Sequence, residues 1–412
     1  MIDTAIEWYA GVDWGSEKHQ ACILDNTGEV VAELEFPHSG TGLAELCNWL
    51  ASVAGNVRAL AVAIEVPHGP VVDALIDRGF VVYAINPKQL DRLRDRFSVA
   101  GSKDDRRDAR VAASGLRTDR HLFRLVQVSN PVIVELREWS RLAEELQQDR
   151  VRLCNRIRQQ LWRYYPQLLD LVDDMAAEWL LELWTMAPTP AKATRLRETT
   201  VALLLKRHRI RRFDAAAVLD ILRRPSLKVA DGVTEAAVLH LRSLITRLRL
   251  ANREFRTAEK KLDELCTALH EEGFDQTHGL SDVAVLSSLP GIGRTTLAIL
   301  IAEASGPLSR RDYAALRTLS GVAPVTKRSG KSHLVCMRYA AHPRLRNALF
   351  YWTRSAIQND PNVHDRYVAL RKRGHTYGRA IRGVADRLLG LACTLLQRHT
   401  VFDPDHGKTV EP

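Results

Sequence analysis

The alternation of apolar and polar residues predicts a mixed α/β layer at the start of the chain. Residues 8–36 alternate with the two-residue period of half-buried strands, and Asn26-Thr27-Gly28-Glu29 has the composition of a hairpin turn. Three antiparallel strands followed by alternating helices and strands define an α/β domain, which we place at residues 1–125. The later elements expected there are a helix over 41–54, a fully buried strand over 57–66, a helix over 71–78, a strand over 80–85, and a basic helical segment that continues through 101–116.

From residue 126 the pattern becomes helical and charged. Two long segments, about 142–164 and 248–269, repeat leucines and other apolar residues in steps of three, four or seven. Such helices predict an antiparallel coiled coil or a dimer seam over a region that we place at 126–280, with an inserted helical segment at about 166–235. The insert carries the basic run 206–212, for which phosphate contact and solvated helix surface are equally good interpretations.

The last unit, placed at 281–412, is expected to be mainly α-helical. Leu289-Pro290-Gly291-Ile292-Gly293 links two apolar helical stretches in the manner of a helix-hairpin-helix turn. Glycines there let backbone amides approach a phosphate, so Gly291, Gly293 and the following Arg294 are predicted nucleic-acid contacts.

Composition favours a polyanion as partner. Lys and Arg number 59 against 49 acids, a net charge of +10, and the isoelectric point is near 9.4. No stretch approaches the roughly 20 uncharged apolar residues of a membrane span. The six cysteines never form a Cys-x-x-Cys pair, so we expect reduced thiols and no zinc site. We therefore expect a cytoplasmic nucleic-acid-binding protein, without a signal peptide or a membrane partner.

Four acids are candidates for one metal site. Asp105 and Asp108 are three residues apart at the start of a predicted helix, so both carboxylates leave the same face. If the strands that end at Asp13 and Glu65 are neighbours, these acids meet at one sheet edge. Four converging acids suit two hard cations, Mg²⁺ or Mn²⁺, about 4 Å apart at a scissile phosphate. The plainer interpretation is a charged helix start, a turn cap at Asp13 and an arginine partner for Glu65.

Basic side chains accompany these acids and recur near the end of the chain. Ser329 lies in a basic loop and has a hydroxyl that can attack phosphorus once a metal or base activates it, or that simply binds phosphate. The densest positive region follows and is the best candidate for the DNA surface. The predicted nucleic-acid contacts outside the glycine turn are Lys103, Arg106, Arg107, Lys327, Arg328, Lys331, Arg338, Arg344 and Arg346.

These pieces, in this order, resemble the insertion-sequence transposases that join a RuvC-like acidic (DEDD) domain to a C-terminal serine transposase domain, the bridge-RNA-guided recombinases. The resemblance spans nearly the whole chain. The family usually has Lys-Thr before its third acid, whereas Asp104 takes the threonine's place here, so Asp104 and Asp105 are both candidates for that acid. We take Asp105, because it alone is three residues from Asp108. The motifs that carry it are Gly11-Val12-Asp13, Ile64-Glu65, 103–109, Pro290 to Gly293, Gly321-Val322-Ala323-Pro324, Ser329-Gly330 and Leu345 to Leu349.

The resemblance implies a function and a set of roles. Asp13, Glu65, Asp105 and Asp108 would hold Mg²⁺, and Ser329 would form a covalent phosphoserine link to DNA during strand exchange. It further implies donor and target DNA, a structured noncoding guide RNA and homodimers that assemble into a tetramer in a bacterial, nucleoid-associated location. In the family, the acidic and serine domains of one site come from different protomers.

Three rival hypotheses stay open on the sequence. A RuvC-like junction resolvase or nuclease would use the four acids without a serine nucleophile. A non-catalytic RNA- or DNA-binding scaffold would use none of them. An actin-like-fold ATPase would use Gly11 to Ser16 as its first phosphate loop, but it needs a second glycine-rich loop and an adenosine motif that the sequence lacks.

Overall fold

The computed structural model describes residues 5–15, 17–97, 104–126, 130–273, 280–330 and 332–404. The chain divides into two compact units, 1–129 and 130–412. Each unit has its own hydrophobic cores.

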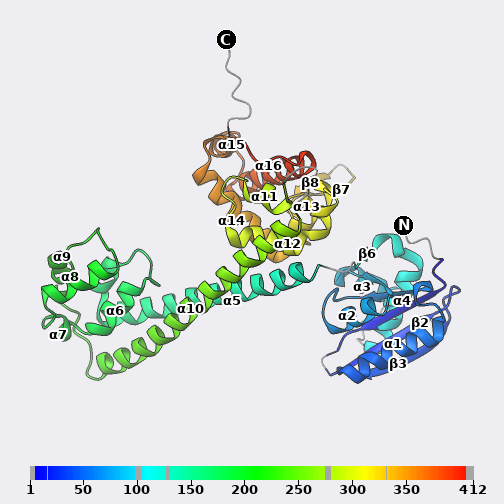
Figure 1. The fold of residues 1–412 in the computed structure, drawn as a ribbon, viewed down its shortest axis with the longest axis horizontal. Coiled ribbons are helices and arrows are strands. Elements are labelled where there is room, and N and C mark those ends of the chain that lie inside the picture. Colours follow the sequence, from blue (N-terminus) through cyan, green and yellow to red (C-terminus); the bar gives the residue numbers. More distant parts are fainter. Residues whose placement is uncertain are drawn as a thin grey trace, which may run out of the picture. The chain divides into compact units, whose positions relative to one another are not determined.

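A six-stranded mixed sheet forms the centre of the first unit (Figure 1). Its order is β3-β2-β1-β4-β5-β6, in which β1, β4 and β5 are parallel and the other neighbours are antiparallel. The alternating pattern correctly predicted the first three strands and the fully buried β4. It missed the antiparallel edge strand β6, which consists of two residues, both of them exposed. The strands are β1 (Trp8–Asp13), β2 (Lys18–Leu24), β3 (Val30–Pro37), β4 (Leu60–Ile64), β5 (Val81–Ala84) and β6 (Arg124–Leu125).

Helices cover both faces of this sheet. Leu46, Leu50 and Leu75 of α1 and α2 pack on one face, whereas Val111 and Leu116 of α4 pack on the other. This three-layer arrangement is consistent with an RNase H-like fold. The basic helical segment expected after the fifth strand is found as two helices, the eight-residue α3 and the longer α4, and Gly101 to Lys103 lie outside the described residues. The helices are α1 (Gly40–Ala54), α2 (Pro70–Asp77), α3 (Pro87–Arg94) and α4 (Asp105–Asp119), with the short 3₁₀ turns η1 (Val57–Ala59) and η2 (Arg120–Leu122).

Two long helices, α5 and α10, run antiparallel through the second unit (Figure 1). Hydrogen bonds join Asn130 to Glu272 at 3.0 Å and Arg150 to Asn252 at 2.7 Å, so the start of α5 lies beside the end of α10. The leucine repeats correctly predicted this pair, which the structure forms within a single chain. Their bounds are α5 (Pro131–Tyr164) and α10 (Val233–Glu272).

The pair of long helices contributes to two separate cores. Ile157, Leu161 and Leu241 pack against the inserted helices, whereas Leu136 and Leu262 pack against the C-terminal helices. Among the described helices, none is both long and apolar enough to cross a membrane. The inserted elements are η3 (Pro166–Leu171), α6 (Glu178–Met186), α7 (Pro190–Ala193), α8 (Glu198–Arg207) and α9 (Ala215–Arg223).

The C-terminal part is mainly helical, as expected. It also contains a two-stranded antiparallel hairpin where the sequence predicted only a loop. The elements are α11 (Asp282–Ser287), α12 (Arg294–Ser309), α13 (Tyr313–Ser320), β7 (Val325–Ser329), β8 (Ser332–Cys336), α14 (Pro343–Asn359), α15 (Pro361–Lys372) and α16 (Tyr377–Arg398).

Candidate active site

Asp13 and Glu65 lie at the same edge of the sheet. In the parallel pair of β1 and β4, Val12 stands opposite Ile64, and each acid is the next residue along its strand. Both are half-buried. The parallel register therefore places two carboxylates on adjacent strands at the carboxyl ends, where α/β sites usually form.

Helix α4 crosses β1 at Gly11. A Cβ at this glycine would lie 2.0 Å from the Ala109 carbonyl oxygen and 2.6 Å from the Ala113 nitrogen. Only the absence of a side chain allows the two backbones to approach so closely. The crossing point is two residues from Asp13 on the strand and one residue from Asp108 on the helix, so α4 brings its acids to the strand that bears Asp13.

Asp108 is buried, with 1% of its surface exposed, and it is bound by Arg94 of α3. Arg94 donates from Nε to Oδ1 at 2.6 Å and from Nη2 to Oδ2 at 2.7 Å. The hydrogen bond to Asp108 raises the pKa of Arg94 above its usual value, and the negative charges of Asp108, Asp91 and Glu65 add to the effect against the opposing influence of burial. One guanidinium therefore lies in the combined field of Asp108 and Glu65.

The four candidate acids offer oxygen ligands, which are the kind that a hard divalent cation prefers. All four candidate side chains are carboxylates, and Asp108 already binds one positive charge, the Arg94 guanidinium. Over the described ranges, however, no three His, Cys, Asp or Glu side chains are gathered closely enough to hold a metal ion. In this structure Arg94 binds both oxygens of Asp108.

The start of α4 separates the two neighbouring candidates for the third acid. Asp104 is the N-cap, and its Oδ1 accepts from the Arg106 backbone nitrogen at 3.2 Å. Asp105 begins the helix and is exposed. The Arg106 side chain forms an ion pair with Glu33 of β3, Arg107 is half-buried and engaged, and Lys103 lies outside the described residues.

A pair of neighbouring histidines, the buried His19 and the exposed His38, was not singled out from the sequence. His19 of β2 is 1% exposed, and its Nε2 lies 2.9 Å from Nδ1 of His38. Trp14 packs edge-on against His19, with ring centroids 5.7 Å apart. Burial lowers the pKa of His19, and the nearby His38 lowers it further. Arg94 was missed as well, because nothing in local sequence spacing links it to an acid fourteen residues away.

Ser329 ends β7 and is exposed. It pairs with Ser332 across the hairpin, and Gly330 at the turn has a φ of 54°, a left-handed conformation that favours glycine. Lys327 and Arg328 are also exposed on this strand. The hairpin thus presents a serine hydroxyl beside two cations, while Lys331 lies outside the described residues.

The glycine turn is partly packed against α14 and partly exposed. Gly291 has a φ of 68°, and a Cβ there would lie 2.4 Å from the Ala356 nitrogen of α14, so this glycine permits close contact between backbones. Trp352 Nε1 donates to the Pro290 carbonyl oxygen at 2.9 Å. Gly293 and Arg294 at the start of α12 are exposed, and Arg294 forms an ion pair with Asp263.

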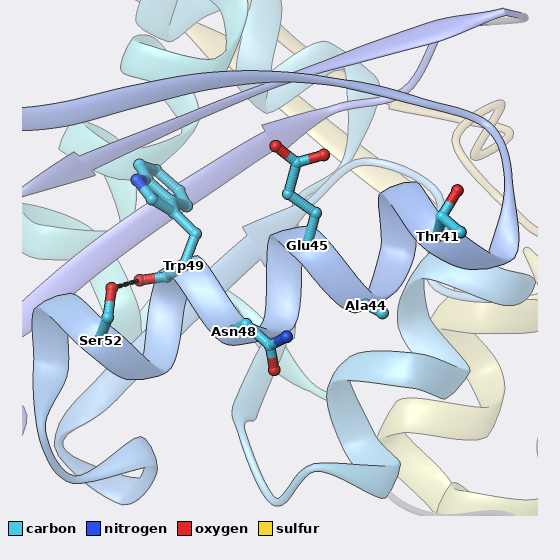
Figure 2. A pocket seen from close by; sticks show the side chains of 6 residues that line it. All are labelled: Thr41, Ala44, Glu45, Asn48, Trp49 and Ser52. Carbon is cyan, nitrogen blue, oxygen red and sulfur yellow. Dashed lines mark hydrogen bonds between the residues drawn. The ribbon is translucent and has the colours of Figure 1, made fainter.

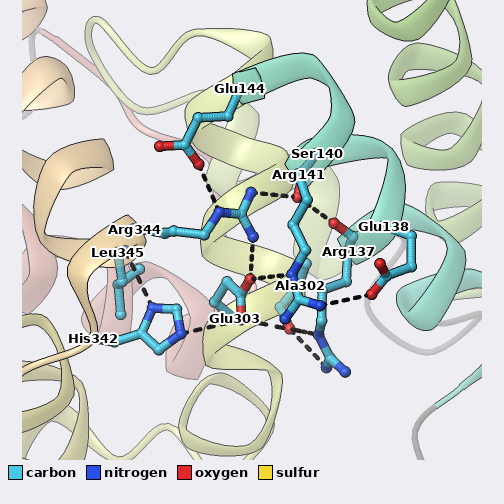
Figure 3. Close-up of polar contacts among 10 residues, drawn as sticks. All are labelled: Arg137, Glu138, Ser140, Arg141, Glu144, Ala302, Glu303, His342, Arg344 and Leu345. Atoms are coloured by element: carbon cyan, nitrogen blue, oxygen red, sulfur yellow. Dashed lines mark hydrogen bonds and ion pairs between the residues drawn. The ribbon is translucent and has the colours of Figure 1, made fainter. Parts of the chain in front are cut away.

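Arg344 lies inside a cluster of charged side chains and is only 17% exposed (Figure 3). Its Nε donates to Glu144 at 2.7 Å, Nη2 donates to Ser140 at 2.9 Å, and Nη1 pairs with Glu303. Its guanidinium is therefore engaged within the protein and not presented to a phosphate.

Two other predicted arginine contacts also bind backbone. Arg346 Nη2 donates to the carbonyl oxygens of Arg338 and Tyr339 at 3.2 and 2.7 Å. Arg338 Nε donates to the Ala323 carbonyl oxygen at 3.3 Å. Both hold the segments that flank the hairpin.

A hollow of about 600 Å³ lies along the outer face of α1 (Figure 2). Of its six lining residues, Glu45 alone is charged, and the others are Thr41, Ala44, Asn48, Trp49 and Ser52. It includes none of the candidate site residues.

An RNase H-like layer with acids at one sheet edge defines a class of nucleic-acid-processing proteins, and comparisons with known proteins agree with it. A model of the DEDD transposase domain of IS110 elements, described as "Transposase", matches residues 10–166. A model described as "Transposase IS116/IS110/IS902 family" matches residues 283–368. The chain belongs to the IS110/IS116 family of transposases.

Curated relatives support this assignment. The mini-circle protein named as a candidate transposase for IS117 of Streptomyces coelicolor is 31% identical over 412 residues, covering 98% of this chain and 97% of the relative. The 43.6 kDa protein of insertion element IS110 from the same organism is 26% identical over 98% of this chain and 97% of its own length. The protein y4uE of Sinorhizobium fredii, named as a candidate transposase, is 62% identical over 209 residues, which are 50% of this chain and 58% of the relative.

Proposed function

We propose that this transposase cuts and rejoins DNA through a covalent link to Ser329, assisted by metal-binding acids. One observation carries the acidic half of the proposal: the parallel register of β1 and β4 brings Asp13 and Glu65 to one sheet edge, and α4 crosses β1 at Ala109, next to Asp108. Carboxylates brought to one edge of a sheet are the ligands that a metal-assisted phosphoryl transfer needs.

Asp13, Glu65, Asp105 and Asp108 are the residues proposed to hold Mg²⁺ or Mn²⁺. Asp104 is left out because its side chain caps α4. A bound cation would neutralise charge on the phosphate and favour ionisation of the attacking hydroxyl. Within the chain itself, Arg94 holds the Asp108 carboxylate in one orientation and balances its buried charge.

Ser329 is proposed as the nucleophile because its exposed hydroxyl lies on a narrow hairpin between cations. A bond forms from its Oγ to phosphorus while a bond from phosphorus to a sugar oxygen breaks; the serine proton passes to solvent and the leaving oxygen gains one. Attack by another sugar hydroxyl reverses this chemistry, so rejoining needs no external energy source. Lys327 and Arg328 contact the phosphate in this scheme.

The choice of sequence and the assembly state are further parts of the proposal, and they rest on the resemblance described from the sequence. A structured noncoding RNA would select donor and target DNA through base pairing, while the protein supplies charge and shape recognition. Homodimers would assemble into a tetramer on the nucleoid.

A denaturing gel for a protein–DNA adduct tests the proposal. Wild type, Ser329→Ala, Asp105→Asn and Ser332→Ala are incubated with Mg²⁺, the element's noncoding RNA and junction and target DNA. Ser332 is the matched control, because it is an exposed serine directly opposite Ser329 on the same hairpin. We expect an adduct in wild type and Ser332→Ala alone. Nicks without an adduct, unchanged in Ser329→Ala, would instead favour the junction resolvase or nuclease.

A further inference from the structure

Helix α10 carries a straight line of basic residues on its exposed side. The positions Arg242, Thr246, Arg249, Arg253, Arg256 and Lys260, here called the basic stripe, are spaced by four, three, four, three and four residues. Residues three and four apart lie above one another on a helix, so the basic stripe follows a single face. Its ends are 18 residue steps apart, which corresponds to about 27 Å.

The basic stripe lies apart from the packing surface of α10. The buried residues of the helix include Leu241, Leu248 and Leu262, none of which belongs to the stripe. Every stripe position is exposed except Arg249, which is half-buried. Packing of α10 against α5 and the inserted helices therefore does not account for the basic residues.

Charge along this part of the helix is poorly compensated. Arg249 donates to Glu178 of α6 at 2.6 Å, and Lys260 pairs with Glu264 at 3.6 Å. Within the described ranges, Arg242, Arg253 and Arg256 have no carboxylate within ion-pair distance. Between positions 236 and 253 the sequence contains four arginines and no acid. Like charges three and four residues apart destabilise a helix, so a bound anion would relieve a repulsion that the chain itself leaves in place.

A hollow of about 460 Å³ opens on the basic stripe between α10 and α6. It is lined by Glu178 and Asn252 together with four stripe residues, Thr246, Arg249, Arg253 and Arg256. Asn252 is buried and fixed, because its Nδ2 donates to the Ala176 carbonyl oxygen at 3.0 Å. The arginines therefore surround an indented surface with a rigid floor, where a phosphate can meet several guanidinium groups.

We propose that the basic stripe binds the phosphate backbone of duplex DNA. Its length of about 27 Å approaches one turn of the double helix, roughly 34 Å, so several phosphates of one duplex can meet the stripe together. The inference deepens the proposed function, on which it rests for the identity of the anion, and it assigns a DNA contact outside both the acidic edge and the serine hairpin.

A second copy of the chain is a poorer occupant for this face. A symmetric dimer would place the same basic stripe against itself or near itself, and like charges in contact cost affinity. DNA carries about one negative charge per 1.7 Å of its axis, which complements a continuous row of arginines without any matching of sequence.

The test measures binding of the full-length chain to a fluorescent duplex of arbitrary sequence and about 30 base pairs, titrated at several salt concentrations. The variant is Arg253→Gln with Arg256→Gln. Its matched control is Arg58→Gln with Arg78→Gln, which removes the same charge from two exposed arginines that precede β4 and β5, at the sheet edge opposite Asp13 and Glu65. We expect the stripe variant to lose about tenfold in affinity and its log–log salt slope to become shallower by about 2, with little change in the control.

A variant that adds charge makes the test independent of damage to the fold. Thr246→Arg fills the gap in the basic stripe at an exposed position of the hollow, so we expect tighter duplex binding and a salt slope steeper by about 1. Equal losses of duplex-DNA affinity in both double variants would overturn the inference. So would a loss of affinity seen only with a duplex RNA of the same sequence. A stripe variant that binds DNA like wild type but changes its mass in analytical ultracentrifugation would instead make the stripe a contact between copies of the chain. If wild type forms no serine adduct while the stripe variant still loses duplex binding, the proposed function fails and the DNA contact stands.

Discussion

Arg94 donates two hydrogen bonds to Asp108, from Nε to Oδ1 at 2.6 Å and from Nη2 to Oδ2 at 2.7 Å, and so joins α3 to α4. The Asp108 side chain is 1% exposed and that of Arg94 is 25% exposed. Because the carboxylate has little access to water, its charge depends on this guanidinium for compensation. A cation that binds Asp108 would compete with Arg94 for this carboxylate.

Loss of the guanidinium should destabilise the first unit. Arg94→Gln leaves the buried Asp108 charge without its partner, and we expect the free energy of unfolding in EDTA to fall by about 3 kcal/mol. Urea denaturation measures the change. Arg92→Gln, an exposed arginine on the same helix, is the control and should stay within about 0.5 kcal/mol of wild type. Equal effects of the two substitutions would show that the Arg94–Asp108 pair contributes little.

Metal addition should distinguish a ligand from a purely structural carboxylate. If Asp108 binds Mg²⁺ and Arg94 competes for it, millimolar Mg²⁺ will raise the melting temperature of Arg94→Gln more than that of wild type, because the variant binds the ion more tightly. Calorimetry with Mg²⁺, and with EDTA as the reference, provides the measurement. Identical shifts in both proteins would argue against competition at Asp108.

The contact between α4 and β1 leaves no room for a methyl group at Gly11. A Cβ there would lie 2.0 Å from the Ala109 carbonyl oxygen, and backbone cannot yield as a flexible side chain does. We expect Gly11→Ala to lower the free energy of unfolding by about 3 kcal/mol or more and to displace Asp105 and Asp108 from the sheet edge. Gly40→Ala is the control, since nothing lies within 4 Å of a Cβ at Gly40. Denaturation curves that coincide for the two variants would contradict this account.

Much of the first unit could be predicted from the sequence, because its pattern has a simple physical origin. Strand β4 is buried throughout because both of its faces are covered, and the structure shows consecutive buried residues in β1 and β2 as well, where alternation was expected. The same reasoning placed Asp13 and Glu65 at one edge, and the observed parallel register confirms that the two strands are neighbours. Arg94 could not be found in this way, since its partnership with Asp108 depends on how α3 and α4 pack.

The second unit was harder to predict where local composition is polar. The hairpin of β7 and β8 has mostly exposed residues, so no buried face produces a pattern, and a loop was the natural expectation. Arg344 and Glu303 are 41 residues apart and meet only through tertiary packing. The arginine-rich sequence therefore predicted a DNA surface, but it could not identify which guanidinium groups turn inward, as that of Arg344 does, and which stay exposed, as that of Arg328 does.

Stability should depend on pH through His19. Burial and the neighbouring His38 lower the pKa of His19 below its ordinary value of 6.5, so the unfolded chain binds a proton more readily than the folded one. Stability is therefore lost as the pH falls below about 6.5, by at most about 1.4 kcal/mol per pH unit for this group. Melting temperatures of wild type and His19→Gln between neutral and mildly acidic pH test the idea. The melting temperatures of the two proteins should differ most at neutral pH and approach each other on acidification. A difference that stays the same at every pH would contradict a role for His19.

Glu303 holds together three helices of the second unit, and its removal should be costly. Its side chain is 6% exposed and lies 3.4 Å from His342 Nε2, 3.8 Å from Arg141 Nε and beside Arg344 (Figure 3). Glu303→Gln keeps the shape but removes the negative charge, which leaves half-buried cations facing one another, and we expect a loss of about 3 kcal/mol in the free energy of unfolding.

The matched control for Glu303 is Glu138→Gln in the same cluster. Glu138 is 61% exposed and pairs with Arg141 at 2.9 Å, so solvent screens its charge and the change should stay below about 1 kcal/mol. Urea denaturation followed by circular dichroism compares the two. A loss for Glu303→Gln no larger than for Glu138→Gln would mean that desolvation of the buried charges already offsets their attraction. A loss several times larger would establish Glu303 as the residue that fixes α5 to α12 and to the segment entering α14.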